Sequence, residues 1–195
     1  MIRLGILGSG NGSNFQAILK AIDAGDLKAE IALVLSDNPD ARILTRARDR
    51  GIPAQVIDCG GYKSKFPLES QQWTAQQLRQ AGAELICLAG FMRLVRHPLL
   101  EAFPSRILNL HPSLLPNFPG LDAWQQALDA GVEETGCTVH LVDAGMDTGP
   151  ILAQRKVAIE SDDTADSLLT RIHAAEHELY PQAIAEYANS LGNMD

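Results

Sequence analysis

The stretch IRLGILGSGNGSN, residues 2–14, joins a mainly apolar run to a loop rich in glycine. Short apolar runs are typical of strands that are buried on both faces of a parallel sheet. Residues 13–24 overlap the end of this loop and have the apolar spacing of a helix. The order of strand, glycine-rich turn and helix predicts the first unit of an α/β fold.

The same alternation continues along the chain. Further strands are predicted at residues 31–35, 85–89 and 107–110, with a weaker candidate at 54–57. Further helices are predicted at residues 40–50, 69–80 and 97–103. Alternation of this kind predicts a Rossmann-like open sheet, twisted and mostly parallel, with helices on both faces.

The C-terminal part of the chain has a different pattern. Residues 138–142 and 151–159 predict two strands, and because only the tight segment DAGMDTGP separates them we expect an antiparallel strand here. A long helix is predicted at residues 164–190, in which Pro181 should produce a kink or a break. Since no linker or internal repeat is present, we expect one domain over residues 1–195.

The composition limits the classes of function. The formal net charge is −8 and no basic stretch is present, which argues against binding to a nucleic-acid backbone. The three cysteines have spacings that match no zinc or redox motif, and free thiols suit a reducing compartment. Without a signal-peptide core or an apolar run of membrane-spanning length, the expected location is the cytoplasm.

The glycine-rich loop, residues 8–14, is a candidate phosphate site. Glycines let a ligand approach the backbone, and free N–H groups at the start of a helix favour an anion. The candidate ligands are Gly12, Ser13 and Asn14. The spacing fits neither the dinucleotide fingerprint nor the P-loop, because the third glycine and the lysine are missing. The alternative is an ordinary strand-to-helix turn with a Ser or Asn cap.

Two further loops should reach the same sheet edge. Asn109 and His111 are two residues apart at a strand end, so their side chains face the same side. An Asn amide can donate to an oxyanion, and a His can act as acid or base. Asp147, in the DAGMDTGP segment, could pair with His111. The alternatives are a turn cap, a satisfied loop histidine and an acid that bonds turn N–H groups.

Four segments, GNGSN, AGFMRLV, NLHPSLLP and DAGMDTGPI, occur in an order and spacing that resemble a known family. The chain resembles, over residues 10–181, the phosphoribosylglycinamide formyltransferases of purine synthesis, also called glycinamide ribonucleotide transformylases. The resemblance implies transfer of the formyl group of 10-formyltetrahydrofolate to the amine of glycinamide ribonucleotide. It implies no metal, and its partners are these two small molecules, with a monomer or weak homodimer expected.

The resemblance also implies which residues form the site. The implied catalytic set is Asn109, His111 and Asp147. The implied nucleotide contacts are Gly12, Ser13, Asn14, Met92, Pro112 and Glu176. The implied folate contacts are Lys65, Met92, Arg93, Leu94, Val95, Asn109, Asp143, Ala144, Gly145, Met146 and Asp147. Departures from the family pattern at His173, Asp122 and Trp124 bear on affinity and pH dependence, not on the reaction.

The implied mechanism is direct attack of the substrate amine on the formyl carbon. Asn109 and a protonated His111 would stabilise the tetrahedral oxyanion, while Asp147 would keep His111 charged and help to move the proton. Methionyl-tRNA formyltransferase and formyltetrahydrofolate hydrolase share these motifs, but each has a further domain that we do not expect here. A non-catalytic nucleotide-binding protein would need the phosphate loop alone.

Two other enzyme classes remain as alternatives. A dinucleotide-dependent oxidoreductase is disfavoured because the glycine fingerprint fails. A metal enzyme could use His173 and His177, which share a helix face, but a third ligand is missing and a solvated helix face explains the pair.

Overall fold

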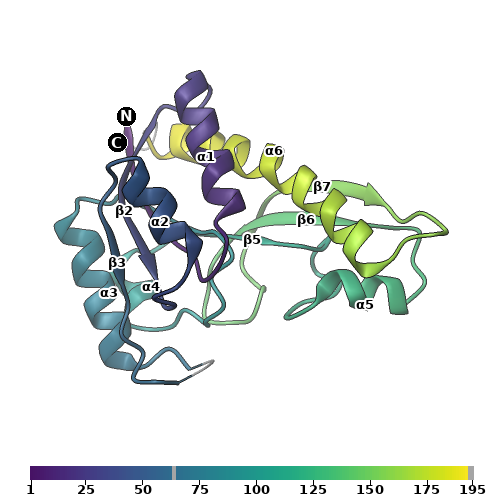
Figure 1. Ribbon diagram of the computed structural model, residues 1–195, viewed down its shortest axis with the longest axis horizontal. Coiled ribbons are helices and arrows are strands. Elements are labelled where there is room, and N and C mark those ends of the chain that lie inside the picture. The colour runs from purple at the N-terminus through teal and green to yellow at the C-terminus, as the bar shows by residue number, and fades with distance from the viewer. Residues whose placement is uncertain (63–64, 193–195) are drawn as a thin grey trace.

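The mainly apolar runs of the sequence form the strands of one sheet (Figure 1). The structure, a computed structural model, describes residues 1–62 and 65–192. The strands are β1 (Ile2–Leu7), β2 (Ala29–Ser36), β3 (Ala54–Val56), β4 (Leu85–Leu88), β5 (Ile107–His111), β6 (Glu134–Leu141) and β7 (Ile151–Ala158). The helices are α1 (Ser13–Ala24), α2 (Arg42–Asp49), α3 (Leu68–Gln80), α4 (Leu99–Ala102), α5 (Ala123–Asp129) and α6 (Ala165–Gly192).

The strand order across the sheet is β3-β2-β1-β4-β5-β6-β7. Neighbouring strands from β3 to β5 are parallel, whereas β6 is antiparallel to both β5 and β7. From β1 the chain adds β2 and β3 on one side, and β4 then lies on the other side of β1, so the order in which strands are added changes direction between β1 and β4. Ligands of open α/β sheets bind at the carboxyl ends of strands beside such a point. The topology therefore places a ligand site between the loops that follow β1 and β4.

These two loops are in direct contact. Ser9, after β1, donates its backbone N–H to the carbonyl of Gly90 at 3.0 Å. The backbone N–H of Met92, after β4, donates to Oγ of Ser9 at 2.9 Å. The candidate phosphate loop and the candidate folate loop are thus held together at the sheet edge.

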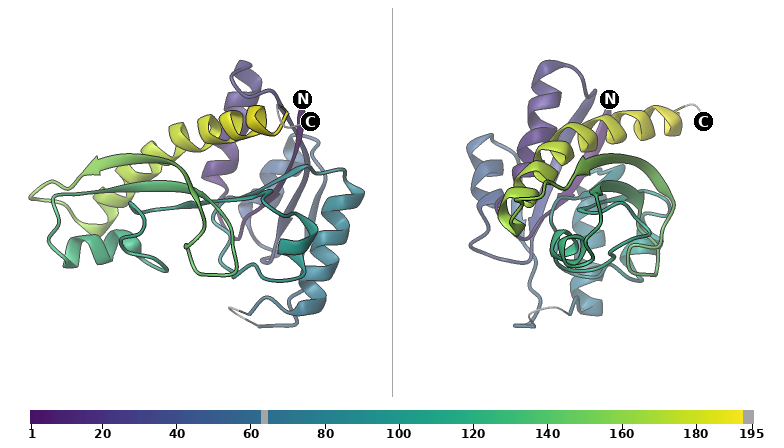
Figure 2. Two further views of the ribbon diagram at one scale, coloured as in Figure 1. Left: turned by 180° about the vertical axis from the view of Figure 1, so that it is seen from behind. Right: turned by 90° about the vertical axis from the view of Figure 1, so that its right-hand side faces the viewer.

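Hydrophobic side chains pack on both faces of the sheet. One cluster joins α1, α2 and α6 to the sheet, with Phe15, Ile43 and Tyr180 fully buried. The other cluster covers the opposite face through α3 and α4, with Leu78 and Leu99 fully buried. Figure 2 shows α6 running beside β6 and β7 and reaching α1, so one helix joins the antiparallel strands to the first helix of the fold.

The predicted fold class is confirmed, including the antiparallel strands and the long C-terminal helix. The helix predicted at 97–103 is reduced to the single turn of α4, and α5 was not predicted. The residue before α5, Asp122, has a left-handed backbone with φ of 52°, which the residue type alone does not indicate. None of the helices among the described residues is long and apolar enough to cross a bilayer.

The prediction that Pro181 kinks or breaks the last helix is wrong as regards a break, because α6 is one helix from Ala165 to Gly192. A proline removes one backbone hydrogen bond and clashes with the preceding turn. Here tertiary packing offsets that cost: Tyr180 donates its hydroxyl to the carbonyls of Leu88 at 3.0 Å and Leu108 at 3.2 Å. Ile184, on the other side of the proline, is fully buried.

Candidate active site

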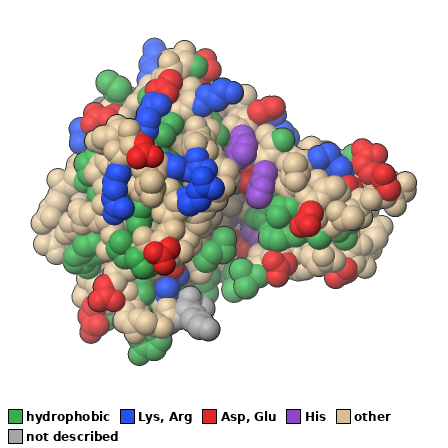
Figure 3. Space-filling view, viewed as in Figure 1, with side chains coloured by type: hydrophobic (Ala, Val, Ile, Leu, Met, Phe, Trp, Pro, Cys, Tyr) green, Lys and Arg blue, Asp and Glu red, His purple; other side chains and the backbone are tan. Residues whose placement is uncertain are grey.

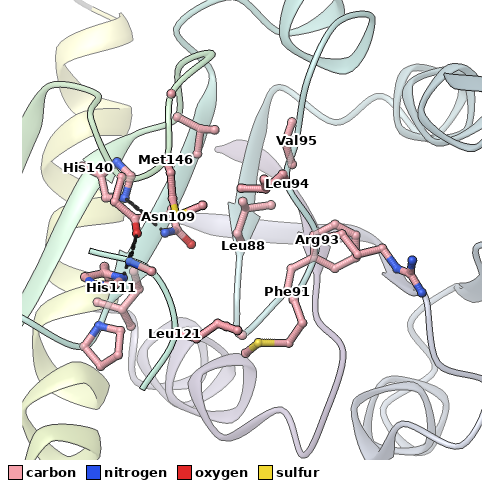
Figure 4. A pocket seen from close by; sticks show the side chains of 18 of the residues that line it. Leu88, Phe91, Arg93, Leu94, Val95, Asn109, His111, Leu121, His140 and Met146 are labelled. Carbon is pink, nitrogen blue, oxygen red and sulfur yellow. Dashed lines mark hydrogen bonds and ion pairs between the residues drawn. The ribbon is translucent and has the colours of Figure 1, made fainter. Parts of the chain in front are cut away.

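The predicted reactive residues lie around one cavity at the end of β5. Asn109 and His111 are both on β5, and Asp147 lies in the loop between β6 and β7. All three line a cavity of about 650 Å³. Figure 4 shows the Asn109 and His111 side chains turned toward the same space, as the alternation of a strand requires.

A second histidine, which the sequence analysis did not single out, completes this group. His140 on β6 is the cross-strand partner of Asn109 in the antiparallel pairing of β5 with β6. Nδ1 of His140 is 2.9 Å from the carbonyl of Leu141, which can only accept, so this nitrogen carries the proton. Nε2 of His140 is 3.1 Å from Nδ2 of Asn109 and 3.6 Å from Oδ1 of Asp147. Nε2 can therefore accept from Asn109 or, once protonated, donate to Asp147.

The His111 ring lies between two acceptors. Nε2 of His111 donates to the carbonyl of Phe118 at 2.8 Å, and Nδ1 is 3.4 Å from Oδ2 of Asp147. A neutral imidazole has one N–H and could satisfy only one of these oxygens, whereas an imidazolium can donate to both. Since the side chain is only 5% exposed, these contacts replace solvent. Both ring nitrogens of His111 therefore face oxygens that can only accept.

The carboxylate of Asp147 is held by several groups at once. Gly120 donates its backbone N–H to Oδ2 at 2.9 Å. Burial acts to raise the pKa of Asp147, but the nearby His140, the hydrogen bond from Gly120 and the positive charge that His111 and His140 carry when protonated outweigh it and lower the pKa. Asp147 is consequently a carboxylate at neutral pH. Its backbone has φ of 55°, a left-handed conformation that Asp tolerates better than most residues.

The segment between β5 and α5 is fixed by side-chain hydrogen bonds as well as by its prolines. Ser113 donates its hydroxyl to the carbonyl of Asn117 at 2.6 Å. Thr138 on β6 donates to the carbonyl of Ser113 at 2.6 Å and accepts from the backbone N–H of Leu115 at 3.0 Å. These bonds hold the segment against β6 and so place Pro112 and the Phe118 carbonyl at the cavity.

The candidate phosphate loop is shaped by one glycine. Gly12, the N-cap of α1, has a left-handed φ of 75°. A Cβ atom at this position would lie 2.9 Å from Cβ of Ile43, so a larger residue would meet both backbone strain and α2. Ser13 and Asn14 open α1, and the backbone N–H groups of residues 12–14 have no acceptor among the described residues. Free N–H groups at a helix start form an anion site.

Glu176 on α6 lies beside this loop. Asn14 donates its amide N–H to Oε2 of Glu176 at 3.0 Å. Burial raises the pKa of Glu176 to about 7, against the smaller lowering effect of the hydrogen bond from Asn14. Gly12, Ser13, Asn14 and Glu176 are not among the residues that line the cavity. These four predicted nucleotide contacts therefore form a second cluster, whereas the other two, Met92 and Pro112, line the reactive cavity.

Comparison with known proteins places this arrangement in a family. Residues 2–184 match the family model described as Formyl transferase. The chain belongs to this family. It is 45% identical over 186 residues to the phosphoribosylglycinamide formyltransferase of Bacillus subtilis, an alignment that covers 95% of this chain and 94% of the relative. A crystal structure of glycinamide ribonucleotide transformylase 1 from Symbiobacterium toebii superposes with a TM-score of 0.93 at 49% identity, covering 97% of this chain and 89% of that one.

Some relatives of this chain are much longer proteins. The trifunctional purine biosynthetic protein adenosine-3 of Drosophila melanogaster is 44% identical over 189 residues. The alignment covers 96% of this chain but only 14% of that protein. The present chain therefore corresponds to one part of the trifunctional protein.

The residues predicted to contact the folate in this formyl transferase differ in whether their side chains are exposed in the cavity or engaged in contacts with the protein. Met92, Leu94 and Met146 are exposed in the cavity, and they are 61%, 43% and 49% exposed respectively. Arg93 also lines the cavity, but Figure 4 shows its guanidinium turned away from Asn109 and His111. It pairs with the buried carboxylate of Asp37 at 2.5 Å, so its side chain fixes the loop.

The remaining predicted folate residues lie at the margins of the cavity. Lys65 lines the cavity, and its carbonyl accepts from Arg93 at 2.5 Å. Val95 is buried among apolar side chains, and Asp143 accepts from the backbone N–H of Gly145 at 2.9 Å. Ala144 is not a lining residue among those described, and its carbonyl accepts from Arg96. Leu121 and Trp124 line the cavity but were not predicted as contacts.

The histidine pair on α6 does not form a metal site with other described residues. The rings of His173 and His177 are stacked with centroids 6.4 Å apart. Within the described ranges, no group of three or more His, Cys, Asp or Glu side chains is placed to hold a metal ion. Burial lowers the pKa of both histidines, and His177 lowers that of His173 further.

Proposed function

We infer that this protein transfers the formyl group of 10-formyltetrahydrofolate to the amine of glycinamide ribonucleotide. The products are formylglycinamide ribonucleotide and tetrahydrofolate, and the reaction belongs to purine biosynthesis. The whole-length similarity to a phosphoribosylglycinamide formyltransferase supports this function. The observation that carries the chemistry is the group of Asn109, His111, His140 and Asp147 around one cavity at the sheet edge.

The two clusters of the site suit the two substrates of the reaction. The substrate phosphate would bind the N–H groups of residues 12–14, and the folate would enter the cavity past Met92 and Leu94. The hydrogen bond between Met92, which lines the cavity, and Ser9, which belongs to the loop after β1, connects the two clusters. A nucleotide held by its phosphate could therefore present its amine to a formyl group held beside Asn109.

The reaction forms one bond and breaks another. The amine nitrogen bonds to the formyl carbon, and the carbonyl oxygen of the formyl group becomes an oxyanion. Collapse of this intermediate breaks the bond between the formyl carbon and the folate nitrogen, which takes up the proton that the amine loses. Nothing in this sequence of steps requires a covalent bond to the enzyme.

Stabilisation of the oxyanion falls to Asn109 and His111. The amide of Asn109 can turn one N–H from His140 toward the oxyanion. Both nitrogens of His111 face protein oxygens, so a charge on the ring would act on the oxyanion through space. A direct hydrogen bond would require one of the nitrogens to release its protein partner. A carboxylate with a lowered pKa is a weak base, so the role of Asp147 is to keep His111 charged more than to carry the proton.

An absorbance assay with 10-formyltetrahydrofolate tests this function directly. Tetrahydrofolate should form only when glycinamide ribonucleotide is present, and formylglycinamide ribonucleotide should form in equal amount. Release of tetrahydrofolate without the nucleotide would indicate a hydrolase instead. Binding of the nucleotide with no turnover would indicate a non-catalytic protein.

We propose further that residues 1–195 act as one formyltransferase domain, as a monomer or weak homodimer. The packing of α6 on both β7 and α1 supports the single domain. The three buried free cysteines, Cys59, Cys87 and Cys137, suit the reducing cytoplasm. Light scattering over a range of concentrations tests the oligomeric state.

A further inference from the structure

The candidate phosphate loop does not hold its shape alone, because α2 contacts it at successive residues. The backbone N–H of Ile43 donates to the carbonyl of Gly10 at 3.2 Å. Arg46, one turn further along α2, donates from Nε to the carbonyl of Asn11 at 2.7 Å and from Nη2 to Oδ1 of Asn11 at 2.9 Å. The side chain of Ile43 then closes the space beside Gly12.

The bond from Arg46 to the carbonyl of Asn11 also sets the direction of the next N–H group. In a planar trans peptide the carbonyl of one residue and the N–H of the next point in opposite directions. With the carbonyl of Asn11 turned toward Arg46, the N–H of Gly12 is turned away from α2. That N–H is one of the free donors at the start of α1, so Arg46 orients a group expected to bind the phosphate.

The guanidinium of Arg46 binds both the backbone carbonyl and the side-chain Oδ1 of Asn11, and so fixes the side chain relative to the backbone. A planar guanidinium with two donors matches a pair of acceptors, whereas an ammonium group is a single point of charge. Arg46 is half-buried, and it brings a positive charge to the loop of a chain whose net charge is −8. Figure 3 shows basic side chains gathered over α1 and α2, beside histidines at a hollow in the surface.

We propose that Arg46 is a positioning residue for the substrate phosphate, which it serves by clamping Asn11 and so aiming the backbone N–H groups of the loop. This inference rests on the proposed formyl transfer to glycinamide ribonucleotide. It adds a residue of α2, outside the loop, to those that determine affinity for the phosphorylated substrate. The clamp acts on substrate binding and not on the reacting atoms.

The test compares Arg46→Ala, Arg46→Lys and Arg48→Ala. Arg48 is on the same helix, is exposed and makes no side-chain hydrogen bond to the described residues, so its loss removes one charge from α2 without touching the loop. Arg46→Ala should raise the KM for glycinamide ribonucleotide about tenfold or more, the size expected when a charge-assisted hydrogen bond is lost. The kcat and the KM for the folate should stay near the wild-type values, and Arg48→Ala should match the wild type.

The same variants are then assayed with the nucleoside that lacks the phosphate. Arg46→Ala should not weaken the reaction of this substrate further, because the group that Arg46 positions has no phosphate to bind. Arg46→Lys should keep most of the defect toward the nucleotide, since lysine cannot hold both acceptors of Asn11. Asn11→Ala, a milder change, should raise the same KM by a smaller factor and should add little to Arg46→Ala.

Three results would overturn the proposal. They are a KM for the nucleotide unchanged in Arg46→Ala, an equal loss with both substrates, and full rescue by lysine, which would leave only a charge effect. If Arg46→Ala does not fold, as a thermal melt would show, Asn11→Ala decides by the same substrate comparison. A wild-type protein that does not formylate glycinamide ribonucleotide would instead contradict the proposed function.

Discussion

The two clusters of the candidate site are built by different means. At the loop after β1 the expected ligands are backbone N–H groups, and their direction depends on a left-handed glycine and on contacts from α2. At the end of β5 the reactive groups are side chains, placed by the pairing of β5 with β6 and by the loop that carries Asp147. The phosphate cluster should therefore be sensitive to backbone shape, and the reactive cluster to the chemistry of single atoms.

The largest effect expected from this comparison is that of Asp147→Asn on kcat. Asn has the shape of Asp and tolerates the left-handed backbone at this position, but it does not keep His111 charged. The kcat should fall by about 10²–10⁴-fold, the range of general acid–base assistance. Substrate dissociation constants should change far less, because the charge acts mainly in the transition state. Single-turnover rates and calorimetric titration of each substrate measure the two quantities.

A thermal melt serves as the control for Asp147→Asn. A folded variant that turns over at the wild-type rate would remove Asp147 from the mechanism. A variant that has lost its fold would make Asp147 a structural residue that joins Gly120 to the histidines. Either result would contradict the expectation that the reactive cluster depends on the chemistry of single side-chain atoms.

The next largest effect is expected at Gly12. Gly12→Val adds atoms where a Cβ already lies 2.9 Å from Ile43, and it forces a β-branched residue into a left-handed backbone. The KM for glycinamide ribonucleotide should rise about tenfold or more, since strain of this kind costs at least 1–2 kcal/mol by rough estimate. Folate affinity should stay almost unchanged, as steady-state kinetics with each substrate varied would show.

Gly10 provides a matched control in the same loop. A Cβ at Gly10 would meet nothing within 4 Å, and its φ is not left-handed. Gly10→Ala should therefore change the nucleotide KM less than Gly12→Ala does. Equal loss of folate affinity in the Gly12 variants would mean that the loop does not serve the phosphate alone.

Much of this architecture could be predicted from the sequence, because local patterns determine it. The apolar runs gave the strands, and the two-residue spacing of Asn109 and His111 correctly placed both side chains on one side. His140 was missed because its partnership with Asn109 depends on the register between β5 and β6, which no local pattern encodes. Its central position in a predicted strand that leads into the DAGMDTGP loop is the signal that could have found it.

Other differences have the same origin in tertiary contacts. Arg93 lines the cavity, and the expectation that it contacts the folate stays a prediction, but the pairing of its guanidinium with Asp37, 56 residues away in the sequence, could not be predicted. The helix around Pro181 continues because Tyr180 and Ile184 are buried on either side of the proline. Both outcomes require knowledge of which distant segment packs against the residue.

A smaller effect is expected from the pH dependence of stability through Glu176. Its pKa is raised to about 7 in the folded protein from an ordinary value of 4.5. Between these pH values the folded state binds more protons than the unfolded state, so this carboxyl lowers stability as the pH rises. The destabilisation should be absent below about pH 4.5 and complete above about pH 7.

Glu176→Gln should remove this part of the pH dependence. The variant keeps an oxygen that can accept from Asn14 but has no charge to bury. Urea unfolding of the wild type and the variant should show the Gln protein gaining relative stability as the pH rises through this window. Parallel curves for the two proteins would mean that Glu176 is ionised at no cost, and that the phosphate cluster contains a stable negative charge.

The smallest effect is expected from chelation. If the side chains of Asn109 and His111 supply the stabilisation of the oxyanion, exhaustive treatment with EDTA should leave kcat unchanged. The measurement is the same absorbance assay, made before the EDTA treatment and again after the treated protein has been freed of the chelator. A reversible loss of activity that zinc restores would contradict the proposal and would add a component to the reactive cluster.

The pairing of Asn109 with His140 across β5 and β6 bears on how this enzyme can diverge. A single residue inserted into either strand would turn every side chain beyond it to the opposite face. The ladder would survive while its reactive groups exchanged places with core residues. Length changes in this molecule are therefore far more tolerable in the connection from β7 to α6, where the chain turns at the exposed residues Glu160 and Asp162. Libraries of insertions should recover active variants there and almost none within residues 107–111 or 134–141.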